Sequence, residues 1–236
     1  FIFRYFDKNT LSPEAVIQPV ETPAARTNNL VQLPDGSVVI LSPGSTLDFP
    51  DTFEGLPKRE VVLKGEAYFD VKRMPDKPFI VHSGKLRTTV LGTSFNVKAL
   101  PGGESITVTV ITGKVQVGDE KETFAVLRPD EQIVHHAEDA KKDVLAVNAD
   151  ALASWKLDDL YCDDITVEQA VLLIEERYHA EVQITDELLK QKRFTTTFGK
   201  EETLESVLSS LALFNDATYS VDRNPAEKQR VILSPK

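Results

Sequence analysis

The sequence contains a single cysteine, Cys162, so it can form no internal disulfide and no thiolate metal site. It also has no apolar run of the roughly 18 residues that a membrane-spanning helix needs. Histidine is scarce, and the adjacent pair His135–His136 would point to opposite faces of a strand. The sequence therefore predicts no bound metal and no cofactor.

Basic residues are also in short supply, with 27 Lys and Arg against 37 Asp and Glu. Binding to a phosphate backbone requires a basic surface, so nucleic acid is excluded as a partner. The acidic excess is concentrated in residues 150–187, where eleven Asp and Glu face only Lys156 and Arg177. This run lacks the spacing of a calcium loop. We interpret it as a solvated acidic face that favours a basic partner surface.

Common catalytic motifs are missing as well. The sequence has no Gly-x-Ser-x-Gly elbow, no P-loop and no His-Glu-x-x-His. We therefore expect a protein that is not a turnover enzyme.

Proline and glycine are nearly absent from the second half. Between Pro129 and Pro225 there is no proline, and the only glycine is Gly199. Turn-rich sequence with short apolar runs thus gives way to sequence that can hold helices. We expect two domains with separate cores, joined through the charged segment Asp139–Ser154, where limited proteolysis should cut.

Alternating apolar and polar residues in the first half predict many short strands. Close spacing of such strands favours a jelly-roll-like antiparallel β-sandwich. At the start of the chain, Phe1, Phe3 and Tyr5 fit either the stub of a removed segment or an edge strand. The predicted strands are 37–41, 59–63, 67–71, 78–82, 86–91, 94–99, 106–111, 114–117 and 131–135.

The second half predicts a small βαβ-βαβ module, because a strand–helix–strand pattern occurs twice. Apolar residues at helical spacing follow Thr166 and again follow Thr203. Thr166 and Gln169 have the spacing of a capping box. The predicted strands are 160–162, 181–184, 194–198, 218–221 and 230–233.

An ordered set of short motifs resembles the periplasmic part of the FecR family of anti-sigma regulators. The motifs are Leu33-Pro-Asp-Gly-Ser37, Gly65-Glu-Ala-Tyr-Phe-Asp-Val71, Pro78-Phe-Ile-Val81, Leu91-Gly-Thr-Ser-Phe-Asn-Val97, Thr112-Gly-Lys-Val115 and Pro129-Asp-Glu-Gln132. In the second half, the pattern Trp155, Leu160, Thr166 and Tyr178 is similar to the secretin/TonB short N-terminal (STN) fold that ends many Bacteroidetes members.

The resemblance implies a sensor in the periplasm that is anchored to the inner membrane. It divides the chain into a leader, 1–29, after a transmembrane segment, a FecR-like all-β domain, 30–145, and an STN-like domain, 151–236. The implied partners are the signalling domain of a TonB-dependent outer-membrane transporter and, through a cytoplasmic segment, an extracytoplasmic-function sigma factor.

Some FecR members cleave themselves at a Gly-Thr bond that corresponds here to Gly92–Thr93. A threonine hydroxyl held near the preceding carbonyl can attack it and form an ester that water opens. A purely structural explanation is that the glycine forms a bulge, as interior glycines often do. If cleavage occurs, we expect Gly92 as the new carboxyl end.

We expect partner contact on edge strands of the second half, where unpaired backbone groups can bind an incoming strand. The candidate strands are Leu160-Tyr161-Cys162 and Val231-Ile232-Leu233. Two other function classes remain open from the sequence. A carbohydrate-binding β-sandwich would need an exposed aromatic platform or a calcium site, and a cupin-like metalloenzyme would need converging histidines.

Overall fold

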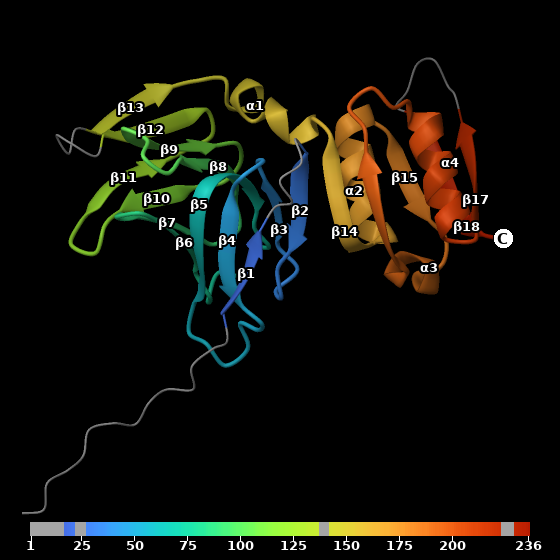
Figure 1. Ribbon diagram of the computed structural model, residues 1–236, viewed down its shortest axis with the longest axis horizontal. Helices are drawn as coiled ribbons and strands as arrows, with labels where there is room; N and C mark the ends of the chain where they lie inside the picture. The colour runs from blue at the N-terminus through green and yellow to red at the C-terminus, as the bar shows by residue number, and fades with distance from the viewer. Residues whose placement is uncertain (1–16, 22–26, 137–141, 223–228) are drawn as a thin grey trace, which may run out of the picture.

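The computed structural model describes residues 17–21, 27–136, 142–222 and 229–236 (Figure 1). The expectation for Phe1, Phe3 and Tyr5 and part of the predicted join, residues 139–141, lie outside these ranges. Within the described ranges, none of the helices has the length and apolar character needed to traverse a bilayer. A β-rich part is followed by an α/β part, as the sequence predicts.

Strand β5 (Arg59–Asp70) belongs to both layers of the β-rich part. Its first half lies in a layer with the order β1 (Ile17–Glu21), β4 (Thr46–Pro50), β5, β6 (Phe79–Ser83), β7 (Leu86–Val90), β10 (Val115–Gly118) and β11 (Thr123–Leu127). Its second half lies in a layer with the order β13 (Lys142–Ala146), β12 (Glu131–His136), β9 (Ser105–Val110), β8 (Ser94–Ala99), β5, β3 (Val38–Leu41), β2 (Asn28–Gln32), β14 (Leu160–Thr166) and β16 (Arg193–Phe198).

Gly65 is the corner at which β5 passes from one layer to the other. Its φ is +111°, and a Cβ there would stand 2.8 Å from the Cα of Ser45. Only glycine combines this backbone angle with so close an approach. The strands predicted at 59–63 and 67–71 are therefore one bent strand.

The two layers enclose a core of apolar side chains that alternate along the strands. Phe69 of β5 stacks on Phe95 of β8, with ring centroids 5.0 Å apart, and meets Phe79 of β6 edge to face. The sequence predicts a purely antiparallel sandwich, but the β5–β6 and β2–β14 ladders are parallel. The β5–β6 ladder can be parallel because the chain continues through the second layer before it returns.

The Leu-Pro-Asp-Gly-Ser motif forms the β2–β3 turn and binds a buried guanidinium. Asp35 accepts hydrogen bonds from the backbone and hydroxyl of Ser37 and from Arg59 Nη1, 2.6 Å away. Arg59 is fully buried and also donates to the carbonyls of Lys72 and Lys77. Burying this cation is tolerable only because the carboxylate and the two carbonyls surround it.

The α/β part follows the predicted order of elements, with short helical segments added, of which α1 (Ala149–Leu152) and a 3₁₀ turn (Ser154–Leu157) precede β14. Strand β14 leads into α2 (Val167–Tyr178) and β15 (Glu181–Ile184), and β16 leads into α4 (Leu204–Phe214) and β17 (Ala217–Asp222). A short helix, α3 (Glu187–Gln191), stands between the units, and β18 (Arg230–Pro235) ends the chain. The capping box of Thr166 and Gln169 is confirmed, and Thr203 caps α4.

The two strands of each unit lie in different sheets. Strands β14 and β16 pair with each other and extend the large sheet, whereas β15, β18 and β17 form a separate sheet of three strands. Each helix lies between these two sheets (Figure 1). This arrangement buries a broad apolar stripe of each helix, for example Val207, Leu208 and Leu211 of α4, and leaves the opposite face exposed.

Replacing Asp35 by alanine should lower the free energy of unfolding by about 3–5 kcal/mol, because it leaves Arg59 buried without its carboxylate. Denaturant titration followed by circular dichroism measures the change. Glu187→Ala is the control, since Glu187 pairs with Lys190 on an exposed helix face and should leave the midpoint unchanged. An Asp35→Ala midpoint equal to that of the unmodified chain would contradict the role of this ion pair.

Candidate functional site

Both strands predicted as open edges are interior strands. Strand β14, which contains Leu160, Tyr161 and Cys162, pairs with β2 on one side and β16 on the other. Strand β18, which contains Val231, Ile232 and Leu233, lies between β15 and β17. The prediction of edge strands at these residues is wrong, because position at the ends of a sequence module does not determine position in a sheet.

The strands with one open side in this part of the chain are β16 in the large sheet and β15 and β17 in the small sheet. The open side of β15 is partly covered, because its Val182 N–H donates to Glu175 Oε1 of α2 over 2.8 Å. Strand β16 instead presents the alternately exposed run Arg193-Phe-Thr-Thr-Thr-Phe198. Among the described strands, β16 and β17 are therefore the accessible edges of the α/β part.

The two parts of the chain meet through a parallel ladder between β2 and β14. The register pairs Leu160 with Asn28 and Cys162 with Leu30. Asn28 also donates from Nδ2 to the carbonyl of Trp155 and from its backbone to that of Asp159. The α/β core accordingly includes three residues of the β-rich part, which are Leu30, Ile40 and Tyr68.

A buried lysine reinforces this junction. Lys156 Nζ lies 3.9 Å from the centroid of the Tyr68 ring and 2.6 Å from Glu176 Oε1 of α2. Burial raises the pKa of the Tyr68 hydroxyl, although the nearby Lys156 opposes that shift. The pKa of Lys156 is also raised, because Tyr68 and Glu176 together outweigh the effect of burial. The three side chains thus connect β5, a 3₁₀ turn (Ser154–Leu157) and α2.

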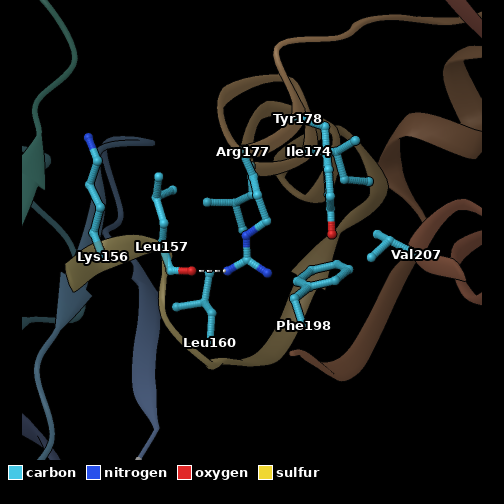
Figure 2. Close-up of a pocket in the computed structure, with 9 residues that line it drawn as sticks. Lys156, Leu157, Leu160, Ile174, Arg177, Tyr178, Phe198 and Val207 are labelled. Atoms are coloured by element: carbon cyan, nitrogen blue, oxygen red, sulfur yellow. Dashed lines mark hydrogen bonds between the residues drawn. The ribbon is translucent and has the colours of Figure 1, made fainter. Parts of the chain in front are cut away.

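A small cavity lies beside this junction (Figure 2). Arg177 enters it from α2 and donates to the carbonyls of Leu157, Asp158 and Gly199. Tyr178 donates to the carbonyl of Glu202. The remaining space is about 10 Å³, room for at most one water molecule. The residues around this cavity therefore hold neighbouring segments together, and the space left is too small for a ligand.

Gly92 and Thr93 form the crossing from β7 in one layer to β8 in the other. Gly92 has φ +152°, and a Cβ there would stand 2.5 Å from the Cα of Arg73. Glycine is therefore required by packing, as the structural explanation of this motif expects. Thr93 is 4% exposed, and its hydroxyl donates to the carbonyl of Lys114 over 3.0 Å.

The Gly92–Thr93 crossing is held from a second side by the Thr112-Gly-Lys-Val115 motif. Gly113 has φ +79°, and a Cβ there would stand 2.9 Å from Thr93 Oγ1 and 3.2 Å from the carbonyl oxygen of Gly92. Two motifs that are separated in sequence thus form one site. An open groove of about 630 Å³, lined in part by Gly92, Thr93 and Lys114, gives solvent access to it.

Sequence reasoning missed the junction residues Asn28, Tyr68, Lys156 and Glu176. Tyr68 lies in the Gly65–Val71 motif, but no local pattern links it to the other three, because the four come from four separate segments. A signal did exist for Lys156, because it is one of only two basic residues within an acidic run. Cys162, predicted at an edge, is instead fully buried beside the junction, and burial raises its pKa to about 12.

Cys162 should report the opening of the junction. In the folded chain we expect almost no reaction with a disulfide reagent at neutral pH, because the thiol is buried and remains protonated. Lys156→Ala removes the contact with Tyr68 and Glu176 and should speed labelling about tenfold or more, as loss of a buried charged partner loosens packing. Lys121→Ala, in an exposed turn, is the control. Equal labelling rates for all three proteins would show that Lys156 does not hold the junction closed.

Two protein-family models match the chain, one in each of its two parts. The family model described as FecR protein matches residues 20–116, and the one described as FecR, C-terminal, matches residues 159–228. No curated protein matches the chain.

Two solved structures are similar over nearly the whole chain. Both are crystal structures of a candidate anti-sigma factor from Parabacteroides distasonis ATCC 8503, at 2.50 Å and 1.65 Å resolution. Each has 28% sequence identity and a TM-score of 0.57. The first alignment covers 94% of this chain and 100% of the other, and the second covers 93% and 99%. With two FecR family models in order along it, the chain belongs to the FecR family.

Proposed function

We propose that the chain is the periplasmic sensor part of a membrane-anchored anti-sigma regulator, which acts through protein–protein contacts. The observation that carries this proposal is the match of both FecR family models in order, one on each side of the junction. The similar structures of a candidate anti-sigma factor support the regulatory role. The relay would run from a TonB-dependent outer-membrane transporter to a cytoplasmic sigma factor.

The proposal includes two domains, a jelly-roll-like domain at 30–145 and an STN-like domain at 151–236. Each has its own apolar core, which supports this division. The shared residues Leu30, Ile40 and Tyr68 indicate that the two domains do not respond independently. A partner that moves β14 would also move β2, because the two strands share a backbone ladder.

We place the transporter contact on the open edge of β16. An incoming strand could pair with this edge, so that main-chain hydrogen bonds supply affinity and alternate side chains supply specificity. Thr195 and Thr197 are exposed there, and neither proline nor a buried charge interrupts the strand. The acidic run beside it favours a basic partner and faster association at low salt.

Thr197→Lys should weaken binding of the transporter signalling domain by at least about tenfold, because a lysine on an edge opposes pairing and repels a basic partner. Titration calorimetry with the purified signalling domain of the cognate TonB-dependent transporter measures the affinity. Thr218→Lys on β17 is the matched control, since Thr218 is equally exposed on the other open edge.

The pair of variants also locates the contact. If only Thr218→Lys weakens binding, the partner docks on the small sheet. If neither variant changes the affinity, docking by strand addition to the α/β part is wrong.

Single-turnover self-cleavage at Gly92–Thr93 is a second candidate activity. The favouring observation is the position of the Thr93 hydroxyl, which is buried and bound to the Lys114 carbonyl beside a glycine that cannot carry a side chain. Attack on the Gly92 carbonyl carbon by Thr93 Oγ would break the Gly92–Thr93 amide and form an ester, as the threonine amine takes up a proton. Water would then open the ester and release the two chains.

Thr93→Ala should abolish this cleavage and Thr93→Ser should retain part of it, because only the hydroxyl acts as the nucleophile. Intact mass spectrometry after prolonged incubation reveals the two fragments, with Thr93 as the new amino end. Melting curves of both variants control for the lost hydrogen bond to Lys114. A cut that persists in Thr93→Ala would refute the mechanism, and an uncut unmodified chain would refute the activity.

A further inference from the structure

A groove lies where the first layer of the sandwich ends and the second layer continues through β2, β14 and β16. Its volume is about 390 Å³. The ladder between β2 and β14 covers only Leu160–Cys162, and β14 then bulges at Asp163 and Asp164. The groove is lined by Asn29 to Gln32, Phe49, Tyr161, Asp163 to Ile165 and Arg193.

Asn29 brings an unused hydrogen-bond acceptor to this groove. The side chain is 6% exposed, and its Oδ1 has no hydrogen-bond partner among the described residues. A buried acceptor without a partner destabilises a fold, so nearly all such atoms in proteins are satisfied. Asn29 stands directly opposite Tyr161 in the β2–β14 register. A donor that enters the groove would satisfy it.

The charged groups of the groove favour a cationic donor. Asp163 forms no ion pair with any described residue and accepts one hydrogen bond, from Thr195. Asp164 is already paired with Arg193, whose Nε lies 2.9 Å from Asp164 Oδ1. This neutralised pair leaves the Asp163 carboxylate and the Asn29 carbonyl oxygen as acceptors.

Two other ligand classes fit less well. A bare divalent ion needs several oxygen ligands, and no group of three acidic, histidine or cysteine residues assembles anywhere in the described ranges. An anion would need a basic group, but the only one that lines the groove, Arg193, is engaged by Asp164. Phe49 and Tyr161 also line the groove, and aromatic rings can attract a cation.

We propose that this groove binds an arginine side chain of a protein partner, with the guanidinium group donating to Asn29 Oδ1 and to the Asp163 carboxylate. A guanidinium presents several N–H donors in a rigid fork, so one group can reach two acceptors at once. The site lies beside the junction of the two parts, and its existence does not depend on the function proposed above.

The test uses the full chain and two blocked peptides, Ac-Ala-Thr-Arg-Thr-Ala-NH₂ and the same peptide with citrulline in place of arginine. Citrulline keeps the shape of arginine and removes its charge. We expect the arginine peptide to shift the amide resonances of Asn29, Tyr161 and Asp163 in ¹⁵N-correlated spectra. The citrulline peptide should bind at least about tenfold more weakly, the usual effect of losing a charge-assisted hydrogen bond.

Two variants test the assigned acceptors. Asp163→Asn should weaken the arginine peptide by about tenfold, and so should Asn29→Leu. Asn29→Leu should also raise the melting temperature, because it removes a buried acceptor that has no partner in the free protein. A purely structural Asn29 would instead lose stability and leave peptide binding unchanged. Glu120→Gln, at an exposed position in the distant β10–β11 turn, is the control and should change neither quantity.

Several results would overturn the proposal. Equal binding of the arginine and citrulline peptides would show that the charge of the guanidinium group does not contribute to binding. Resonance shifts that map outside the groove, or no shifts at the highest soluble peptide concentration, would show that the groove is not the binding site. If Asn29→Leu does not fold, Asp163→Asn decides the question by itself.

Discussion

The parallel ladder between β2 and β14 is the interaction on which the rest of the structure depends. It joins an early strand of the β-rich part to the first strand of the α/β part, and so continues one sheet across both. Because of this ladder, Leu30, Ile40 and Tyr68 face the α/β core instead of solvent. The same ladder places β16 at the open edge of the large sheet and creates the groove where β2 and β14 separate.

The junction depends on specific polar contacts as well as on apolar packing. Lys156 is nearly buried and is satisfied by the ring of Tyr68 and the carboxylate of Glu176, each from a different element. A buried charge of this kind adds little net stability, but it strongly disfavours any arrangement in which its partners are absent. Arg177 also disfavours other arrangements, because its three carbonyl partners come from two separate segments of the chain. The junction therefore has one well-defined closed arrangement.

This arrangement supports the proposed action through protein–protein contacts. The small cavity beside the junction is nearly filled by Arg177, and two larger grooves among the described residues are open to solvent. The accessible features are an edge strand, an acidic surface and a groove with an unused acceptor. All three lie within or beside the α/β part, and the β2–β14 ladder couples that part to the sandwich.

The sequence by itself determined most of the strands and the two long helices, because alternation, capping residues and turn residues act over a few neighbours. It predicted the capping box at Thr166 and a special backbone at Gly92, and its ordered motifs identified the family. It missed β1, β2, β4, β11, β13, α1 and α3, whose patterns are short, and it read the single bent strand β5 as two. Only the tertiary structure decided that β14 and β18 are interior strands, that Gly113 packs on Thr93, and that Asn29 and Asp163 line one groove. Strand order and the contacts of buried polar groups depend on pairing between residues far apart in sequence, and no local pattern encodes that pairing.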